Sequence, residues 1–171
     1  MKELLIKNKW ISFGGSSYVS DTNDNKLFEV KGKIFTFTRK KLINTLEGDT
    51  KYIVRNKFWR LFVYRAFVLD PLGNIEATVR RKVFSFHDRY FVESQKYGQI
   101  ELKGNILGFD YHIYLNGEEI GHIGRRISLR DSFVLSIDDS KIDYLFVVAL
   151  VIAIDNITDQ RRDDASSSNY D

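Results

Sequence analysis

The chain has 171 residues, with 13 Phe, 9 Tyr, 2 Trp, a single Pro and no Cys. The lack of cysteine excludes a disulfide framework, a thiol nucleophile and any cysteine-ligated metal. Its 26 basic and 23 acidic side chains give a net charge of +3 that is spread over the whole chain, whereas a dedicated nucleic-acid binder concentrates its positive charge on one stripe.

Short strands separated by turns are predicted from residue 4 to residue 137, because β-branched and aromatic residues alternate with polar ones. Asn116-Gly117 favours a two-residue type I′ hairpin, and Asp70-Pro71-Leu72-Gly73 favours a type I turn. Some of the expected strands should merge; they cover residues 4–13, 16–20, 27–31, 33–38, 41–45, 51–55, 57–69, 75–80, 82–86, 89–94, 98–102, 106–115, 119–125 and 132–137.

One pattern occurs three times, in Asp24–Lys33, Gly73–Lys82 and Gly117–Arg126. Each copy has a turn residue, then a small or apolar residue four positions on, a β-branched residue six on and a basic residue nine on. Self-similarity at a spacing of roughly 45–50 residues indicates a supersecondary unit that is used several times. We interpret this unit as a meander of short antiparallel strands.

The C-terminal region departs from the strand pattern. Residues 141–157 are predicted to form a helix, and the eleven residues 144–154 contain no charged side chain. A helix that is apolar on all sides must be enclosed. Eleven residues reach only ~16 Å, which is short of the ~30 Å hydrocarbon core of a bilayer. We therefore expect a buried helix and no transmembrane span, followed by a polar, flexible tail over residues 158–171.

Antiparallel strands can enclose such a helix by closing into a barrel, which also removes the edges of the sheet. We thus predict a mainly β protein with a single domain over residues 1–157. Its expected architecture is a closed antiparallel barrel of about twelve strands around the buried C-terminal helix.

Three segments resemble the LURP-one-related family: Phe28-Glu-Val-Lys-Gly-Lys33, Arg130-Asp-Ser-Phe-Val134 and Leu145–Asp155. The resemblance extends over residues 1–157 and implies the Tubby C-terminal fold, which these bacterial and plant domains share with phospholipid scramblases. Two departures stand out. Asp24 replaces a usual turn glycine, and Gly121 replaces the more common alanine.

The chain contains no motif typical of catalysis or nucleotide binding, so we expect no enzyme, no catalytic residue, no metal site and no cofactor. A two-residue turn at Asn116-Gly117 would place His112 opposite Gly121 and His122 opposite Tyr111. The two imidazoles would then point to opposite faces of the sheet. In that arrangement they could not share a metal ion.

An acidic cluster, formed by Asp138, Asp139 and Asp143, precedes the predicted helix. Its oxygen atoms could hold Ca²⁺, and the resemblance to scramblases points the same way, because those proteins respond to Ca²⁺ through an acidic segment. The cluster lacks the alternating spacing of a calcium loop, however. Acidic residues at a helix start also complement the helix dipole, so both interpretations stay open.

Basic residues recur where each copy of the repeat ends, and they form the predicted anion-binding site: Lys33, Arg81, Lys82, Arg125 and Arg126. Arg81 has the same strand parity as Ala77 and Val79, and a cation cannot continue that face into a core without a large desolvation cost. These residues are therefore expected at the barrel rim, where guanidinium groups suit phosphate. Charged strand ends that prevent mispairing are the alternative. In Tubby-like domains a basic site binds phosphoinositide head groups.

We expect a non-enzymatic binding module that is cytoplasmic and peripheral at the membrane, since residues 1–20 lack the pattern of a signal peptide. The expected partner is an anionic phospholipid surface or a phosphoinositide head group. A protein-interaction or nucleic-acid-associated domain is the second hypothesis, with nucleic acid ranked lower because most aromatic residues are needed in the barrel core. A small-ligand carrier or enzyme with a cavity beside the helix is the third.

Overall fold

The computed structural model describes residues 1–7, 16–32, 38–57, 64–81, 88–105, 110–125 and 132–167. The predicted strands at 33–38 and 82–86 fall largely outside these residues. Twelve strands lie within them: β1 (Lys2–Lys7), β2 (Ser16–Ser20), β3 (Lys26–Gly32), β4 (Lys41–Thr45), β5 (Thr50–Asn56), β6 (Arg65–Leu69), β7 (Ile75–Arg81), β8 (Asp88–Ser94), β9 (Gly98–Asn105), β10 (Asp110–Leu115), β11 (Glu118–Arg125) and β12 (Ser132–Ile137).

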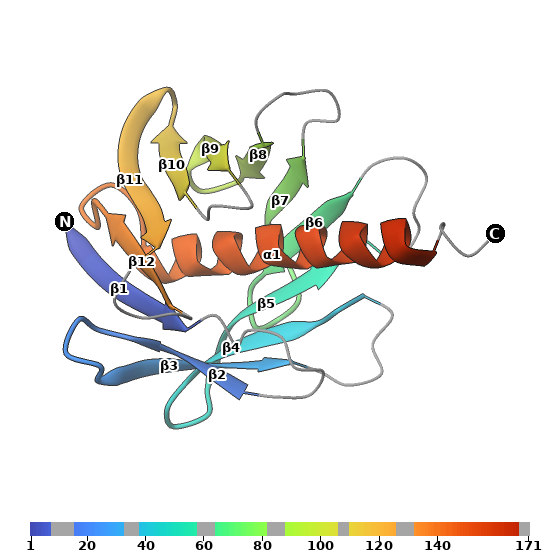
Figure 1. Cartoon of the computed structure of the whole chain (residues 1–171). Helices are drawn as coiled ribbons and strands as arrows, with labels where there is room; N and C mark the ends of the chain where they lie inside the picture. The colour runs from blue at the N-terminus through green and yellow to red at the C-terminus, as the bar shows by residue number, and fades with distance from the viewer. Residues whose placement is uncertain are drawn as a thin grey trace.

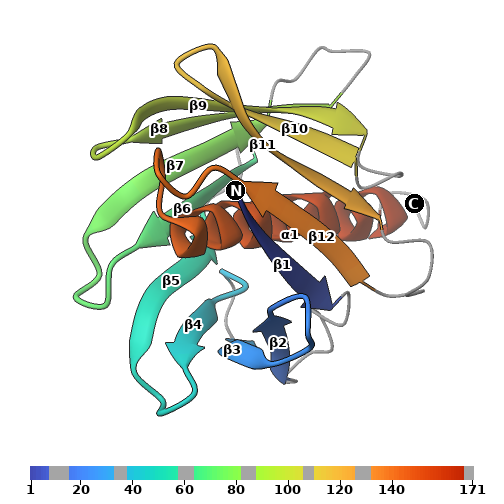
Figure 2. The ribbon, with the colours of Figure 1, turned by 90° about the vertical axis from the view of Figure 1, so that its left-hand side faces the viewer.

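The strands close into one antiparallel barrel. Each pairs with its neighbours in the chain, and β1 pairs with β12 to complete the ring. The helix α1 (Tyr144–Ser167) runs through the middle of this barrel, as Figure 1 and Figure 2 show from two directions. This architecture confirms the prediction of a barrel of about twelve strands around a C-terminal helix.

Side chains alternate between the core and the outer surface along the strands. In β7, Ala77 and Val79 are buried whereas Arg80 is exposed, and in β10 Ile113 is buried whereas His112 is exposed. A period of two is typical of a sheet with one face on the core and one in water. The inner face is therefore apolar, and it packs against the helix.

The first half of α1 forms the centre of the core. Phe146, Leu150 and Ile152 have no exposed surface. The centroid of the Phe146 ring lies 6.0 Å from that of Tyr52 and 5.0 Å from that of Tyr97, within the range of favourable aromatic pairs. The apolar run predicted to be enclosed on every side is thus surrounded by strands.

The helix is longer than the sequence predicted, since it extends to Ser167 rather than ending near residue 157. Its second half is polar but is not all exposed, because it meets polar groups on the strands. Asn56 donates through Nδ2 to Gln160 Oε1 (2.6 Å) and to the carbonyl oxygen of Asn156 (3.1 Å). The hydroxyls of Tyr90 and Thr158 lie 3.2 Å apart. These partners stabilise a helical segment that is too polar to be predicted as buried.

The repeat has a clear structural basis at its first residue. Asp24, Gly73 and Gly117 have φ angles of 65°, 94° and 90°. Each copy therefore begins with a residue in the left-handed region, one or two positions before the start of β3, β7 or β11 in the three equivalent hairpins. Aspartate tolerates this region better than most other residues, which explains how Asp24 can replace the glycine.

Candidate functional site

Odd-numbered strands all end at one end of the barrel. There β3, β5, β7 and β11 finish with Gly32, Asn56, Arg81 and Arg125. The second half of α1 lies at the same end, because Asn56 is hydrogen-bonded to Asn156 and Gln160. We call this the helix-exit end, defined by the four strand-terminal residues.

Two of the five predicted anion-binding residues lie at the helix-exit end. Arg81 and Arg125 are the last residues of β7 and β11. Three further predicted residues follow directly after a strand and lie outside the described residues: Lys33, Lys82 and Arg126. The equivalence seen in the repeat thus corresponds to equivalent strand ends of the barrel.

Arg81 is held by an acidic neighbour across its own hairpin. Its Nη2 and Nε atoms lie 2.7 and 3.1 Å from Oδ1 of Asp88, and both side chains are about one-fifth exposed. The inward parity predicted for this strand is confirmed, since Ala77 and Val79 are buried. Arg81 is therefore the last residue on the inward side of β7, and Asp88 neutralises its charge. These contacts fit a structural ion pair better than an open phosphate-binding site.

Other cations at the helix-exit end join the helix to the strands. The Nζ atom of Lys41 lies 3.1 Å from Oδ2 of Asp155, and Arg39 forms an ion pair with Asp163. Burial raises the pKa of Asp155, and the charge of Lys41 opposes that rise. By contrast, Lys57 is exposed one residue beyond the end of β5. Among the described cations at this end, some form ion pairs with the helix and others are exposed to solvent.

The ends of β3, β7 and β11 do not converge on one point. These strands lie four positions apart around the closed barrel, with three other strands between each pair. At ~4.8 Å per strand, their ends lie about 20 Å apart along the rim. The repeat therefore distributes these three strand ends around the rim rather than bringing them together at one point.

The predicted register of the last hairpin is wrong. His112 pairs directly with His122, and Ile113 pairs with Gly121, because the register shifts between Ile113 and Tyr114. This irregularity adds one residue to β11 in the hairpin, which reverses the relative facing of the two histidines. Their rings lie on the same outer face with centroids 4.8 Å apart.

Sequence reasoning therefore missed a cluster of side chains on the outer face, formed by Asp110, His112, Glu119 and His122. His122 Nε2 lies 2.5 Å from Asp110 Oδ1, and His112 Nδ1 lies 2.8 Å from Glu119 Oε1. The shared parity of Asp110 and His112 was visible in the sequence. The position of His122 was not, because it depends on the bulge.

In the acidic cluster before the helix, Asp138 and Asp143 accept hydrogen bonds from residues two positions further along the chain. Asp143 Oδ1 accepts from the backbone nitrogen of Leu145 at 2.8 Å, which makes Asp143 the N-cap of α1. Asp138 Oδ1 accepts from the backbone nitrogen and the hydroxyl of Ser140. The hydrogen bonds from Ser140 lower the pKa of the Asp138 carboxyl. The structure thus favours the helix-start interpretation.

A hollow of about 530 Å³ lies on the outer face of the barrel, lined by Arg80, Phe91, Glu93, Glu101 and Tyr114 among others. Arg80 and Glu93 form an ion pair within it. This hollow is not the cavity beside the helix that the third hypothesis requires. Inner positions on the same strands, such as Val79 and Leu102, are fully packed in the core.

A closed twelve-stranded barrel threaded by its own C-terminal helix defines the class of this protein. Residues 2–155 match the LURP-one-related family, and the chain belongs to that family. A crystal structure of a protein from Arabidopsis thaliana has a similar fold, with a TM-score of 0.65, 18% sequence identity and 92% of each chain covered. No curated protein matches the chain. Within the described residues, no helix has the length and apolarity needed to cross a bilayer.

Proposed function

We propose that this LURP-one-related domain is a non-catalytic binding module that docks on an anionic phospholipid surface through the helix-exit end of its barrel. The observation that supports this proposal is that β7 and β11 end in Arg81 and Arg125 at the same end of the barrel, where β3 ends one position before Lys33 in the sequence. Exposed Lys57 lies at the same end and adds to the positive charge there.

A flat surface suits this arrangement better than a single head group. Basic positions about 20 Å apart cannot contact one phosphate together, but each can meet a different lipid. A basic residue near an anionic leaflet contributes about 1 kcal/mol, so several acting together give useful binding where one alone does not. The proposal therefore assigns the contact to Lys33, Lys82, Arg125 and Arg126, while Arg81 serves the β7–β8 hairpin through Asp88.

The proposal can be tested by co-sedimentation with vesicles of phosphatidylcholine alone, with added phosphatidylserine, and with added phosphoinositide. The test variant changes Lys33, Lys82, Arg125 and Arg126 to Ser. The matched control removes the same charge from the opposite end by changing Lys26, Lys51, Lys96 and Lys141 to Ser. We expect binding that requires anionic lipid, weakens as salt rises, and is lost only in the test variant.

Equal binding by the test variant and the control would contradict docking through the helix-exit end. The same conclusion would follow if the wild-type chain failed to bind every anionic vesicle at low salt. Binding to phosphoinositide but not to phosphatidylserine would replace the proposed surface contact with recognition of one head group. Circular dichroism on each variant checks that the barrel is still folded.

A further inference from the structure

The outer face of β10 and β11 carries a compact group of nitrogen and oxygen ligands. Asp110, His112 and His122 each offer one ligand atom, and these three atoms all lie within 4.8 Å of one another. A tetrahedral zinc ion with ligands at ~2.0–2.1 Å separates neighbouring ligand atoms by about 3.3 Å. Small side-chain rotations would bring the three atoms to that spacing.

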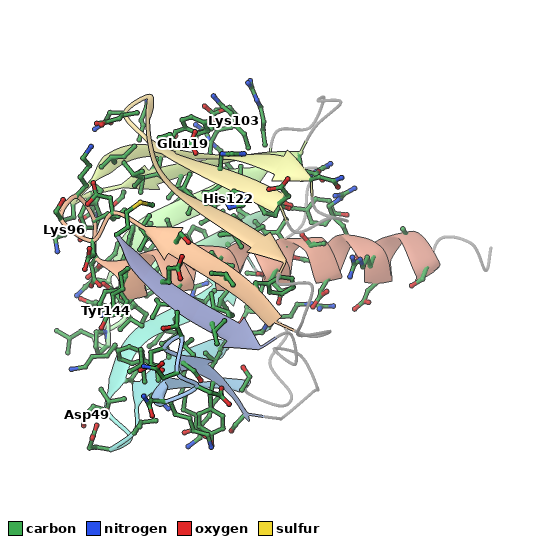
Figure 3. All side chains as sticks on the ribbon, turned by 60° about the vertical axis from the view of Figure 1, so that its left-hand side comes forward. Asp49, Lys96, Lys103, Glu119, His122 and Tyr144 are labelled. Atoms are coloured by element: carbon green, nitrogen blue, oxygen red, sulfur yellow. The ribbon has the colours of Figure 1, made fainter. Side chains whose placement is uncertain are left out.

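The strand pairing holds the group together without help from a loop. Asp110 and His112 are two positions apart in β10 and share its outer face, and His122 is the direct cross-strand partner of His112. All three side chains are accessible, with exposed fractions of 64%, 46% and 41%. An ion can therefore reach the group from solvent. Figure 3 shows His122 and Glu119 on this side of the barrel.

Gly124 leaves the space in which the His122 ring lies. A Cβ atom at position 124 would lie only 2.8 Å from Cε1 of His122. Any larger residue would therefore push the imidazole away from its place beside Asp110. The glycine at position 124 thus leaves room for the His122 imidazole beside Asp110.

Glu119 forms the hydrogen bond that the second ring nitrogen of a metal-bound histidine usually makes. His112 Nδ1 lies 2.8 Å from Glu119 Oε1, which leaves Nε2 of the same ring for an ion. A carboxylate bonded to the second nitrogen orients the ring and makes it a stronger ligand.

We propose that Asp110, His112 and His122 bind a divalent transition-metal ion of the zinc class, with Glu119 as the positioning residue behind His112. Imidazole with carboxylate suits Zn²⁺, Cu²⁺ and Ni²⁺, whereas Ca²⁺ and Mg²⁺ prefer oxygen ligands alone. An ion bound to both His122 Nε2 and Asp110 Oδ1 takes the place of the hydrogen bond between them, and its proton is released to solvent. Three protein ligands leave one position of a tetrahedral ion for water or a ligand. The site lies on the side of the barrel and does not depend on lipid docking.

The simplest test is isothermal titration of zinc chloride into the full chain without a histidine tag, near neutral pH. We expect one equivalent of saturable binding in the wild-type protein and none in the double variant His112→Asn with His122→Asn. Glu119→Gln should weaken zinc binding by about 10- to 100-fold, because it removes the charged partner of His112 but no ligand. Asp49→Asn, a change of an exposed turn aspartate away from the site, should leave the affinity unchanged.

A Gly124→Ala variant tests the geometry with every ligand in place. It should weaken zinc binding on the order of tenfold, because a shift of the imidazole disrupts the ligand spacing. Substitution with Co²⁺ gives a second measurement, since its visible absorption reports imidazole coordination. Absence of saturable zinc binding in the wild-type protein would overturn the proposal, as would equal affinity in the wild type and the double-histidine variant. Each variant is checked for folding by circular dichroism, and the ligands are exposed, so loss of the barrel is not expected.

Discussion

Lys41 Nζ lies 3.1 Å from Asp155 Oδ2, in a nearly closed space between β4 and the middle of α1. The side chains are only 7% and 17% exposed. Ionised groups in such surroundings are stable only as a pair, because either one alone would keep an uncompensated charge away from water. The ion pair therefore connects the middle of α1 to the start of β4.

Removing one member of this pair should be costly. We expect Asp155→Asn to lower the free energy of unfolding by about 3–5 kcal/mol, because Lys41 is left buried with its charge uncompensated. The measurement is urea denaturation followed by circular dichroism. Lys41→Met in the Asp155→Asn background should recover a substantial part of the loss. Strict additivity of the two single changes would contradict the coupling.

The stability of the protein should fall with rising pH because of Asp159. Burial, with the nearby Asp155 charge, raises the pKa of Asp159 to about 6 from 3.8. Between these two values the folded chain binds a proton that the unfolded chain has lost, so the free energy of unfolding decreases as pH rises through this window. Asp159→Asn should therefore stabilise the protein above about pH 6. We expect a gain of about 1–2 kcal/mol in the free energy of unfolding, because partial solvation of the carboxyl makes the gain smaller than the pKa difference alone implies.

Urea midpoints measured at closely spaced pH values across and above this window check the effect of Asp159. The matched control is Asp139→Asn, a change of an exposed aspartate in the turn before the helix. A pH profile of Asp159→Asn parallel to that of the wild type would show that this carboxyl does not cause the dependence.

Gly121 cannot accept an added methyl group without movement of its neighbours. A Cβ atom there would lie 2.5 Å from Ile137 Cδ1 and 2.6 Å from the carbonyl oxygen of Ser136. We expect Gly121→Ala to lower the free energy of unfolding by about 1–3 kcal/mol through this overpacking. Gly124→Ala in the same strand is the control, since its new methyl group meets only the movable end of the His122 ring. Equal costs in urea denaturation would contradict the overpacking argument.

The acidic residues before α1 should act on helix stability rather than on calcium binding. Asp143→Ala removes the N-cap bond to Leu145 and should cost about 1 kcal/mol. Asp143→Asn keeps a capping oxygen and should cost less. Thermal denaturation with and without Ca²⁺ separates the two interpretations. A rise in Tm that occurs with Ca²⁺ in the wild type but not in Asp143→Ala would favour the calcium site.

Much of the fold could be predicted from local patterns. Alternating polarity predicts strands, because side chains in a strand alternate between the two faces of the sheet whatever its partners are. The repeat predicted equivalent hairpins, and the positive φ angles of Asp24, Gly73 and Gly117 show the common turn conformation behind it. The enclosed helix followed from the absence of charge over residues 144–154.

The candidate sites were harder to predict, because they depend on register and on distant partners. A bulge after Ile113 turned two histidines that seemed to face apart into a pair on one face. Asp88 sits seven positions after Arg81, yet nothing in the spacing shows that it neutralises Arg81 across the hairpin. Whether a bulge forms is decided by packing around it, and sequence periodicity does not contain that information.

The sequence by itself determined the strands, the repeat, the apolar half of α1 and therefore the closed barrel, since each follows from the spacing of polar and apolar residues along a short segment. Only the tertiary structure decided which buried polar groups form ion pairs and hydrogen bonds with one another. Lys41 and Asp155 are 114 positions apart, and Asn56 and Gln160 are 104 apart. These pairs form because barrel closure brings β4 and β5 against the helix, where burial makes each polar group depend on its partner.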